Sequence, residues 1–291
     1  MNDIIYIHKG ELPFYLKLSI KQSLSVMPNI KIHLITDSKF EHRGVFVYPL
    51  KDYRGDANKF EEKYIHLSTN TYDFELFCFQ RWLVLKEFTV TENLQGSFVY
   101  LDSDVFLYSD IFQKLDLGSY KMTVTGGYLP MYSLFKDKDS IIDFSNFLLS
   151  YFSEIEKIEY LKNYYNKEFL SKCKLGGVCD MTILGLYSSN CLDLFGLNKG
   201  YFNTTIFNFS LDAKRLGFDK NKFNLKAFRY KDKKASIGNV LLHALHFQGD
   251  SKILAPRFYT GEYKFFVNFY GFVNQKTKGI SRRLLKALKK I

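Results

Sequence analysis

The chain has 291 residues, and 46 % of them are hydrophobic, which is enough to bury a sizeable core. Much of its net charge of +11 comes from residues 263–291, which hold eight Lys or Arg and no Asp or Glu. A basic tail of this kind argues against a nucleic-acid-binding surface spread over a domain. The sequence contains no run of about 18 apolar residues, so no membrane-spanning helix is predicted. The four cysteines lack the spacing that is typical of a zinc site.

The first half of the chain alternates predicted strands and helices. Strands are predicted over 4–8, 31–36, 44–48 and 97–101, helices over 12–26 and 74–88, and a polar loop over 51–71. Strands separated by helices of this length indicate βαβ units and a mainly parallel sheet. Neither a charged region nor a long apolar stretch precedes the first strand, so a reduced cytoplasmic compartment is the simplest expectation.

The second half is less regular. A strand is predicted over 121–125, helices over 140–166 and 180–189, and an apolar extended segment over 239–247. No internal repeat and no Pro- or Gly-rich linker interrupts the chain. We therefore expect one α/β domain over residues 1–262, followed by an aromatic and basic tail over residues 263–291.

Two aspartates follow the apolar strand predicted over 97–101. Residues two apart in an extended segment point to the same side, so Asp102 and Asp104 would present their carboxylates together at the carboxyl end of a buried strand. Ligands bind at that end of the strands in open α/β sheets, and paired carboxylates suit Mg²⁺ or Mn²⁺ held against a diphosphate. The alternative is a pair of aspartates that only caps a turn and the following helix.

An apolar strand followed by D-x-D-V, as in residues 97–105, also fits the first motif of haloacid-dehalogenase-type phosphatases. In that motif the first aspartate is a nucleophile. Such a motif normally follows the first strand of its domain, whereas here a complete βαβ half precedes Asp102. No matching acidic pair ends a later apolar strand. Both observations favour the metal and diphosphate interpretation over the phosphatase.

A second constellation is the heptapeptide HFQGDSK, residues 246–252. A neutral imidazole at His246 can complete a metal site begun by two carboxylates. Gly249 lets the backbone approach a phosphate closely, and Lys252 supplies a point charge for a diphosphate. The alternative for a histidine at the end of a strand is a purely structural role.

The segment YLDSDVFLYSDI, residues 100–111, resembles the metal-binding stretch of glycosyltransferase family 8, and HFQGDSK matches the family's C-terminal motif H-x-x-G-x-x-K. Arg81 matches the arginine on the helix before the D-x-D strand. The resemblance implies a GT-A fold, which is Rossmann-like with a mainly parallel central sheet flanked by helices. It also implies a metal-dependent transferase that uses a nucleotide sugar, with UDP preferred.

By this resemblance the metal ion, Mn²⁺ or Mg²⁺, would be held by Asp102, Asp104 and His246. The donor would be contacted by Ile7, His8, Asp37, Arg81, Asp102, Ser103, Gly249 and Lys252. Three departures make the chain a distant relative: Ile253-Leu254 replaces the family's Pro-Trp, GGVCDMT replaces its Asn-x-Gly element, and Ile7-His8-Lys9 replaces small residues and Asp at the end of the first strand.

Asp180 is the candidate catalytic residue, because it opens a predicted helix just after the Gly176-Gly177 turn. If the enzyme inverts, Asp180 could be the general base that deprotonates the acceptor hydroxyl. If the enzyme retains, Asp180 could position sugar hydroxyls or stabilise developing positive charge. The alternative is an N-cap, whose carboxylate satisfies the first N–H groups of the helix.

The C-terminal residues 281–291 predict a basic amphipathic helix, preceded by the aromatic run FFVNFYGF over 265–272. Together they favour peripheral binding to the inner face of a membrane over simple packing on the domain. The predicted acceptor is a glycan or lipid-linked glycan, in bacterial surface-polysaccharide biosynthesis. A catalytically inactive relative that binds a glycan or a membrane is the non-enzymatic alternative.

Overall fold

The computed structural model describes residues 2–113, 115–194, 205–210, 228–231, 234–237 and 240–262. The chain divides into two compact units. The first comprises Met1–Glu11, Ile30–Asp102 and Leu115–Leu197, and the second comprises Leu12–Asn29, Ser103–Lys114 and Asn198–Ile291. One crossing between the units therefore lies between Asp102 and Ser103, inside the predicted metal-binding motif.

The first unit contains a seven-stranded sheet with the order β3-β2-β1-β4-β7-β6-β8. Its strands are β1 (Asp3–His8), β2 (Lys31–Thr36), β3 (Val45–Pro49), β4 (Phe98–Leu101), β6 (Met122–Val124), β7 (Tyr132–Phe135) and β8 (Cys191–Asp193). Only β7 runs antiparallel to its neighbours β4 and β6, and the other pairs are parallel. Strands β2 and β3 are added on one side of β1, and β4 is added on its other side, so the point between the parallel strands β1 and β4 is a topological switch point. Open α/β sheets bind ligands at the carboxyl ends of the strands at such a point.

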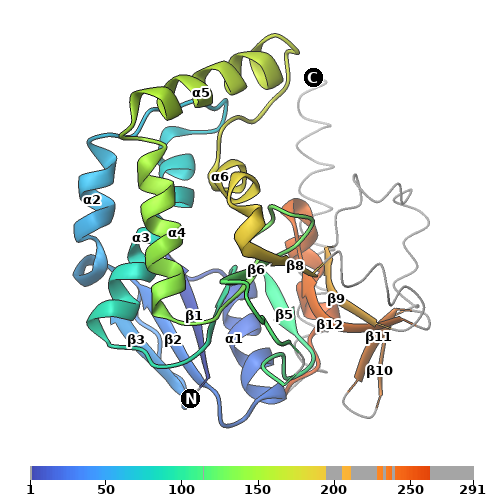
Figure 1. Ribbon diagram of the computed structural model, residues 1–291. Coiled ribbons are helices and arrows are strands. Elements are labelled where there is room, and N and C mark those ends of the chain that lie inside the picture. The colour runs from blue at the N-terminus through green and yellow to red at the C-terminus, as the bar shows by residue number, and fades with distance from the viewer. Residues whose placement is uncertain are drawn as a thin grey trace, which may run out of the picture. The chain divides into compact units, whose positions relative to one another are not determined.

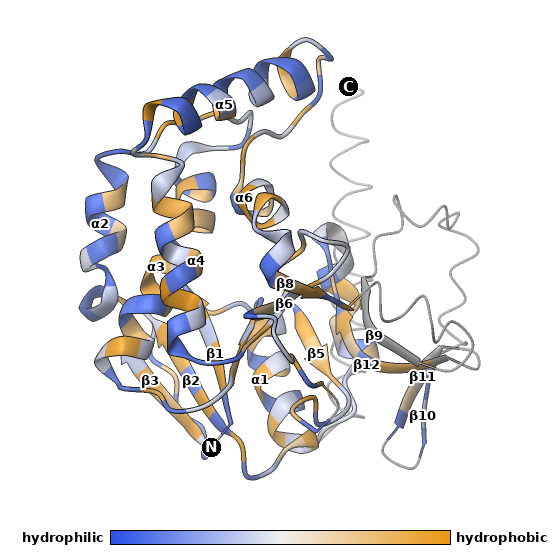
Figure 2. Cartoon of the chain, viewed as in Figure 1, coloured by the Kyte–Doolittle hydropathy of each residue, from blue (hydrophilic) through white to orange (hydrophobic). Residues whose placement is uncertain are grey.

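The central strands of this sheet are mainly apolar and almost completely buried. All four residues of β4 are buried, and so are the first five of β1. Figure 2 shows the same strands mainly in the hydrophobic colour. Near-continuous apolar runs are typical of strands covered on both faces, which is why residues with high β propensity at these positions specify the interior of a parallel sheet.

Helices α2 (Gly55–Glu61), α3 (Tyr72–Thr91) and α4 (Lys138–Ser150) pack side by side in the first unit, with α3 in the middle (Figure 1). Helix α3 is buried on several faces, since Leu76, Trp82 and Leu83 all lie in the core. Helix α6 (Asp180–Leu186) carries the candidate catalytic residue at its first position. Helix α5 (Ile155–Tyr165) buries only one residue and is mostly hydrophilic (Figure 2).

The second unit contains a sheet with the order β10-β11-β12-β5, in which β9 also pairs with β12. Its strands are β5 (Val105–Leu107), β9 (Thr205–Ser210), β10 (Phe228–Lys231), β11 (Lys234–Ile237) and β12 (Val240–His246). Helix α1 (Phe14–Val26) packs against β5, because the side chains of Ser19 and Gln22 donate hydrogen bonds to the carbonyl groups of Val105 and Leu107. A short 3₁₀ helix (Gly249–Leu254) and α8 (Ala255–Phe258) follow β12.

The predicted strands over 4–8, 31–36, 44–48, 97–101, 121–125 and 239–247 are confirmed as β1, β2, β3, β4, β6 and β12. The polar loop predicted over 51–71 is wrong, because it contains α2, whose apolar face consists of little more than Ala57 and Phe60. The single helix predicted over 140–166 is also wrong. It breaks between α4 and α5, where the Ser150 and Ser153 hydroxyl groups bond to backbone carbonyls and so compete with the helical pattern.

The predicted C-terminal helix over 281–291 and the aromatic run over 265–272 lie outside the described residues. Among the residues that are described, no helix has the length and apolar character needed to cross a membrane.

Candidate functional site

The second unit brings together three residues of the two sequence motifs. Asp104 Oδ2 lies 3.0 Å from Lys252 Nζ, and Asp104 Oδ1 lies 3.3 Å from His246 Nε2. The Asp104 side chain is only 7 % exposed, whereas that of Lys252 is 35 % exposed. The D-x-D and H-x-x-G-x-x-K motifs, 142 residues apart between Asp104 and His246, therefore form one cluster with a buried carboxylate and a more accessible ammonium group.

Strand pairing explains this meeting. Strand β12 runs antiparallel to β5 in a register that sets His246 opposite Val105, the residue after Asp104. The backbone N–H of Phe247 then donates to the carbonyl of Asp104 at 2.9 Å, which continues the ladder past the strand end. Burial by itself would raise the pKa of Asp104, but the hydrogen bond with His246 and the charge of Lys252 outweigh it and lower that pKa.

Gly249 and Lys252 lie in the 3₁₀ helix after β12. Gly249 has φ of 58°, a left-handed conformation that glycine adopts without strain, and a Cβ added there would have no described neighbour within 4 Å. Its backbone conformation, rather than crowding within the chain, is thus what favours glycine. The Lys252 ammonium group also lies 5.1 Å from the centre of the Tyr15 ring, a cation–π contact that orients it.

The first unit holds a second, buried cluster around Arg81 on α3. Its Nη1 donates to Asp102 Oδ1 at 2.6 Å, while its Nε and Nη2 both donate to Asp180 Oδ2. The Asp180 side chain is 3 % exposed and that of Arg81 is 14 % exposed. Burial disfavours the charged guanidinium, but the two carboxylates outweigh that effect and raise the pKa of Arg81. One guanidinium therefore ties the predicted metal ligand Asp102 to the candidate catalytic residue.

Two aromatic residues complete this cluster, and neither was singled out from the sequence. The indole N–H of Trp82 donates to Asp180 Oδ2 at 3.0 Å, and the hydroxyl of Tyr100 donates to Asp102 Oδ1 at 3.0 Å. Both rings also lie about as far from the Arg81 guanidinium as a cation–π contact allows, at 5.3 and 5.5 Å. The only available signal was their position, since Trp82 adjoins Arg81 and Tyr100 precedes Asp102 by two residues.

Asp180 does not act as an N-cap, which was the alternative to a functional role. Cys179 is the N-cap of α6, and its backbone N–H bonds to the Thr182 hydroxyl. The Asp180 carboxylate points instead to Arg81 and Trp82. This arrangement fits a residue that positions other groups. The roles predicted for Asp180, as general base or as a group that positions the sugar, stay predictions.

The glycine turn before α6 fixes Asp180 against the rest of the first unit. Gly177 forms a β-bridge with Ser68, and the next residue, Val178, donates to the carbonyl of Leu67 at 2.8 Å. A Cβ at Gly177 would lie 2.2 Å from that carbonyl oxygen, closer than real contacts allow. Ser68 in turn donates to Glu75 on α3, the helix that also carries Arg81.

Replacing Gly177 by Ala should therefore displace the turn and lower the free energy of unfolding by about 1–3 kcal/mol, because the added methyl group overpacks a site that has no room for it. Urea unfolding followed by circular dichroism measures the change. Gly185→Ala is the matched control, because its Cβ would meet its nearest neighbour at 3.6 Å and a helical Gly→Ala change is ordinarily stabilising. Equal stabilities of the two variants would contradict the close-contact argument.

The predicted metal ligands form a group in the structure. Asp102, Asp104 and His246 each offer one ligand atom, and these three atoms lie within 4.8 Å of one another. Two carboxylates and an imidazole are ligand types that suit a hard divalent cation such as Mg²⁺ or Mn²⁺. Ser103, between the aspartates, is half-buried in the turn that leads to β5.

The predicted donor residues at the ends of β1 and β2 also come together. Ile7 is buried near the end of β1, and the His8 Nε2 lies 3.0 Å from the carbonyl oxygen of Glu11. After β2, Asp37 Oδ2 accepts a bond from the N–H of Gly10 at 3.4 Å. These residues therefore form part of one edge, at the carboxyl ends of parallel strands, where their predicted contact with a nucleotide remains a prediction.

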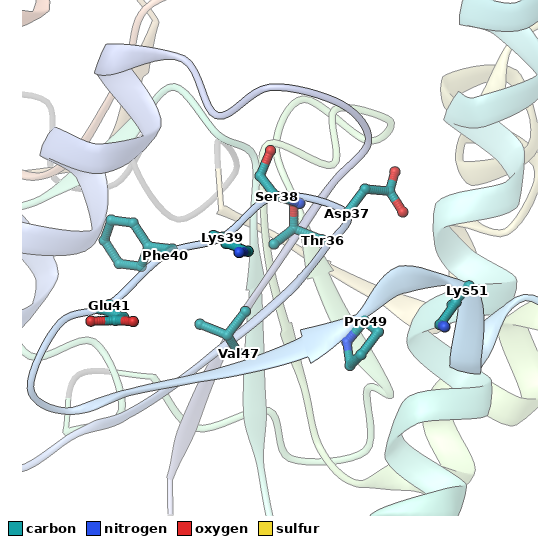
Figure 3. A pocket seen from close by; sticks show the side chains of 9 residues that line it. All are labelled: Thr36, Asp37, Ser38, Lys39, Phe40, Glu41, Val47, Pro49 and Lys51. Carbon is teal, nitrogen blue, oxygen red and sulfur yellow. The ribbon is translucent and has the colours of Figure 1, made fainter.

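A cavity of about 390 Å³ opens beside Asp37, over the ends of β2 and β3 (Figure 3). Val47 and Pro49 of β3 form an apolar wall, and Asp37, Ser38 and Lys51 contribute polar side chains to its lining. Sequence reasoning named only Asp37 in this region.

No known protein family and no curated protein matches the chain. Solved structures resemble it at low identity. The galactosyltransferase LgtC, in complex with donor and acceptor sugar analogues, is 13 % identical, with 93 % of this chain and 95 % of that chain covered and a TM-score of 0.48. The glycosyltransferase GlyE of Streptococcus pneumoniae TIGR4 is 13 % identical over 93 % and 61 %, with a TM-score of 0.45. Mouse xyloside xylosyltransferase 1 is 8 % identical over 86 % and 99 %, with a TM-score of 0.51.

The similarity to mouse xyloside xylosyltransferase 1 shows the fold. The chain has the α/β GT-A fold of glycosyltransferases, with a mostly parallel central sheet flanked by helices. The fold class predicted from the sequence is therefore confirmed, while membership of glycosyltransferase family 8 stays a prediction.

Proposed function

We propose that this chain is a metal-dependent glycosyltransferase that moves a sugar from a nucleotide diphosphate donor, with UDP preferred, to a glycan or lipid-linked glycan. The observation that carries the proposal is the cluster in which the Asp104 carboxylate contacts both His246 and Lys252. A buried carboxylate with an imidazole and a half-exposed ammonium group is suited to a cation and a diphosphate.

The proposed role of each residue follows from the chemistry of its side chain. Asp102, Asp104 and His246 would hold Mn²⁺ or Mg²⁺, which when bound neutralises charge on the departing diphosphate. Lys252, the most exposed member of its cluster, would contact a phosphate oxygen with its ammonium group. Gly249, in its left-handed conformation, directs the chain from His246 toward Lys252. The role of the protein is then mainly electrostatic, because it offers fixed charges where negative charge develops.

Arg81 and Asp180 would act on the sugar side of the reaction. Asp180 is tied to Arg81 and Trp82 and is nearly inaccessible in this state, so its carboxylate is oriented before any ligand arrives. An oriented carboxylate can accept hydrogen bonds from sugar hydroxyls or stabilise positive charge at the reacting carbon. Arg81 would hold Asp180 and Asp102 in one arrangement.

The phosphatase alternative requires Asp102 to be a free nucleophile. Asp102 Oδ1 instead accepts hydrogen bonds from Arg81 and Tyr100, which lower its nucleophilicity by stabilising the negative charge. The geometry therefore favours a ligand role for this carboxylate.

The membrane-facing tail, the cytoplasmic location and a place in bacterial surface-polysaccharide biosynthesis remain predictions of the sequence. The tail comprises residues 263–291, which lie outside the described residues.

Calorimetric titration with UDP and GDP, in Mn²⁺ and in EDTA, tests the nucleotide part of the proposal. We expect one nucleotide to bind in Mn²⁺ and to lose most of its affinity in EDTA, because the diphosphate binds through the cation. A panel of sugars linked to that nucleotide, assayed for slow hydrolysis, then identifies the donor. Absence of metal-linked nucleotide binding and of donor cleavage would leave the inactive, ligand-binding relative as the better account.

A further inference from the structure

Tyr100 is a buried residue whose hydroxyl group meets the predicted metal ligand Asp102. It lies in β4, is 2 % exposed, and packs its ring on Trp82 with the ring centres 5.1 Å apart. Its hydroxyl accepts a hydrogen bond from Arg81 Nη1 at 3.1 Å and donates one to Asp102 Oδ1 at 3.0 Å. The hydroxyl thus links a guanidinium to a carboxylate.

Two donors converge on the same oxygen of Asp102. Arg81 Nη1 lies 2.6 Å from Oδ1, and the Tyr100 hydroxyl lies 3.0 Å from it. Two hydrogen bonds from different directions fix the rotation of the carboxylate about its Cβ–Cγ bond. The direction of Oδ2 follows from that of Oδ1, so these donors also decide where the carboxylate presents its second oxygen.

Arg81 orients Asp102 less independently than Tyr100 does. Its Nε and Nη2 donate to Asp180, so the position of the guanidinium depends on two carboxylates at once. Tyr100 comes from the same strand end as Asp102, two residues earlier, and a phenol ring held in a core has little freedom of its own. The tyrosine hydroxyl is thus the donor whose position depends least on what happens at Asp180.

We propose that Tyr100 is a positioning residue for the metal-binding carboxylate of Asp102. The inference rests on the proposed function, since it assumes that Asp102 joins Asp104 and His246 around a divalent cation. Hydrogen bonds to a ligating carboxylate typically change metal affinity by about 10–100-fold. A merely structural hydroxyl, present only to satisfy Arg81, would affect stability and leave metal affinity unchanged.

Tyr100→Phe separates these two roles, because it removes the hydroxyl and keeps the ring that packs on Trp82. Tyr187→Phe is a matched control in the same unit. Tyr187 is also 2 % exposed and donates its hydroxyl to a carboxylate, that of Asp143. The affinity of the full-length protein for Mn²⁺, alone and with UDP, is measured from the electron paramagnetic resonance signal of free Mn²⁺. Unfolding midpoints in EDTA are recorded for both variants.

We expect Tyr100→Phe to weaken Mn²⁺ binding by about 10–100-fold and Tyr187→Phe to leave it unchanged. Unchanged Mn²⁺ affinity in Tyr100→Phe, or equal weakening in both variants, would overturn the positioning role. A wild-type protein that binds no Mn²⁺ would overturn it together with the metal site. Failure of the wider proposal shows itself separately, as the absence of nucleotide-sugar cleavage by the wild type.

Discussion

Asp104→Asn should abolish metal-linked nucleotide binding and reduce donor cleavage by at least about 100-fold, since losing a direct ligand must cost no less than losing a partner of one. The amide keeps the shape of the side chain but removes the negative charge that faces His246 and Lys252. A divalent cation would then enter a site with one carboxylate fewer and an ammonium group no longer neutralised. Calorimetry with Mn²⁺ and the preferred nucleotide measures the effect.

Asp3→Asn is the matched control for this substitution. Asp3 is a buried carboxylate paired with a histidine, with Oδ1 3.1 Å from His33 Nε2, and its side chain is 8 % exposed against 7 % for Asp104. Both changes remove one buried charge from an Asp–His pair. If Asp3→Asn reduced nucleotide binding as much as Asp104→Asn, the effect would reflect general destabilisation, and the assignment of Asp104 as a ligand would fail.

Arg81→Met should lower the free energy of unfolding by about 3–5 kcal/mol, the usual result of removing one partner from a buried ion pair. Asp102 and Asp180 would lose the guanidinium that both contact, and the Asp180 side chain is 3 % exposed. The same variant should lose donor cleavage, because neither carboxylate keeps its orientation. Urea unfolding followed by circular dichroism gives the stability change.

Lys86→Met provides the comparison on the same helix. Lys86 pairs with a single carboxylate, that of Asp56, whose side chain is 33 % exposed. Its loss should cost about 1 kcal/mol or less, since solvent screens a partly exposed pair. A cost for Arg81→Met no greater than this would show that the Arg81 cluster is not a tightly buried network.

Strands β1, β2, β4 and β6 could be predicted because each is a short, mainly apolar run whose burial is nearly complete. Helix α2 could not, because a seven-residue helix with two buried residues carries too few periodic positions. The candidate metal ligands came from motifs of known spacing. The Tyr100 and Trp82 hydrogen bonds had no such signal, because aromatic residues beside a buried strand or helix are ordinarily core.

The sequence alone determined which residue types stand at the strand ends, and hence that Asp102 and Asp104 lie at the carboxyl end of a buried strand. It predicted that they point to the same side of an extended segment, whereas the chain turns at Ser103 and Asp104. Only the tertiary structure decided their partners: Arg81 and Tyr100 for Asp102, and His246 and Lys252 for Asp104. The alternation of side chains is a local property of one strand, but partners are chosen by which strands and helices pack together, and that depends on the burial of the whole core.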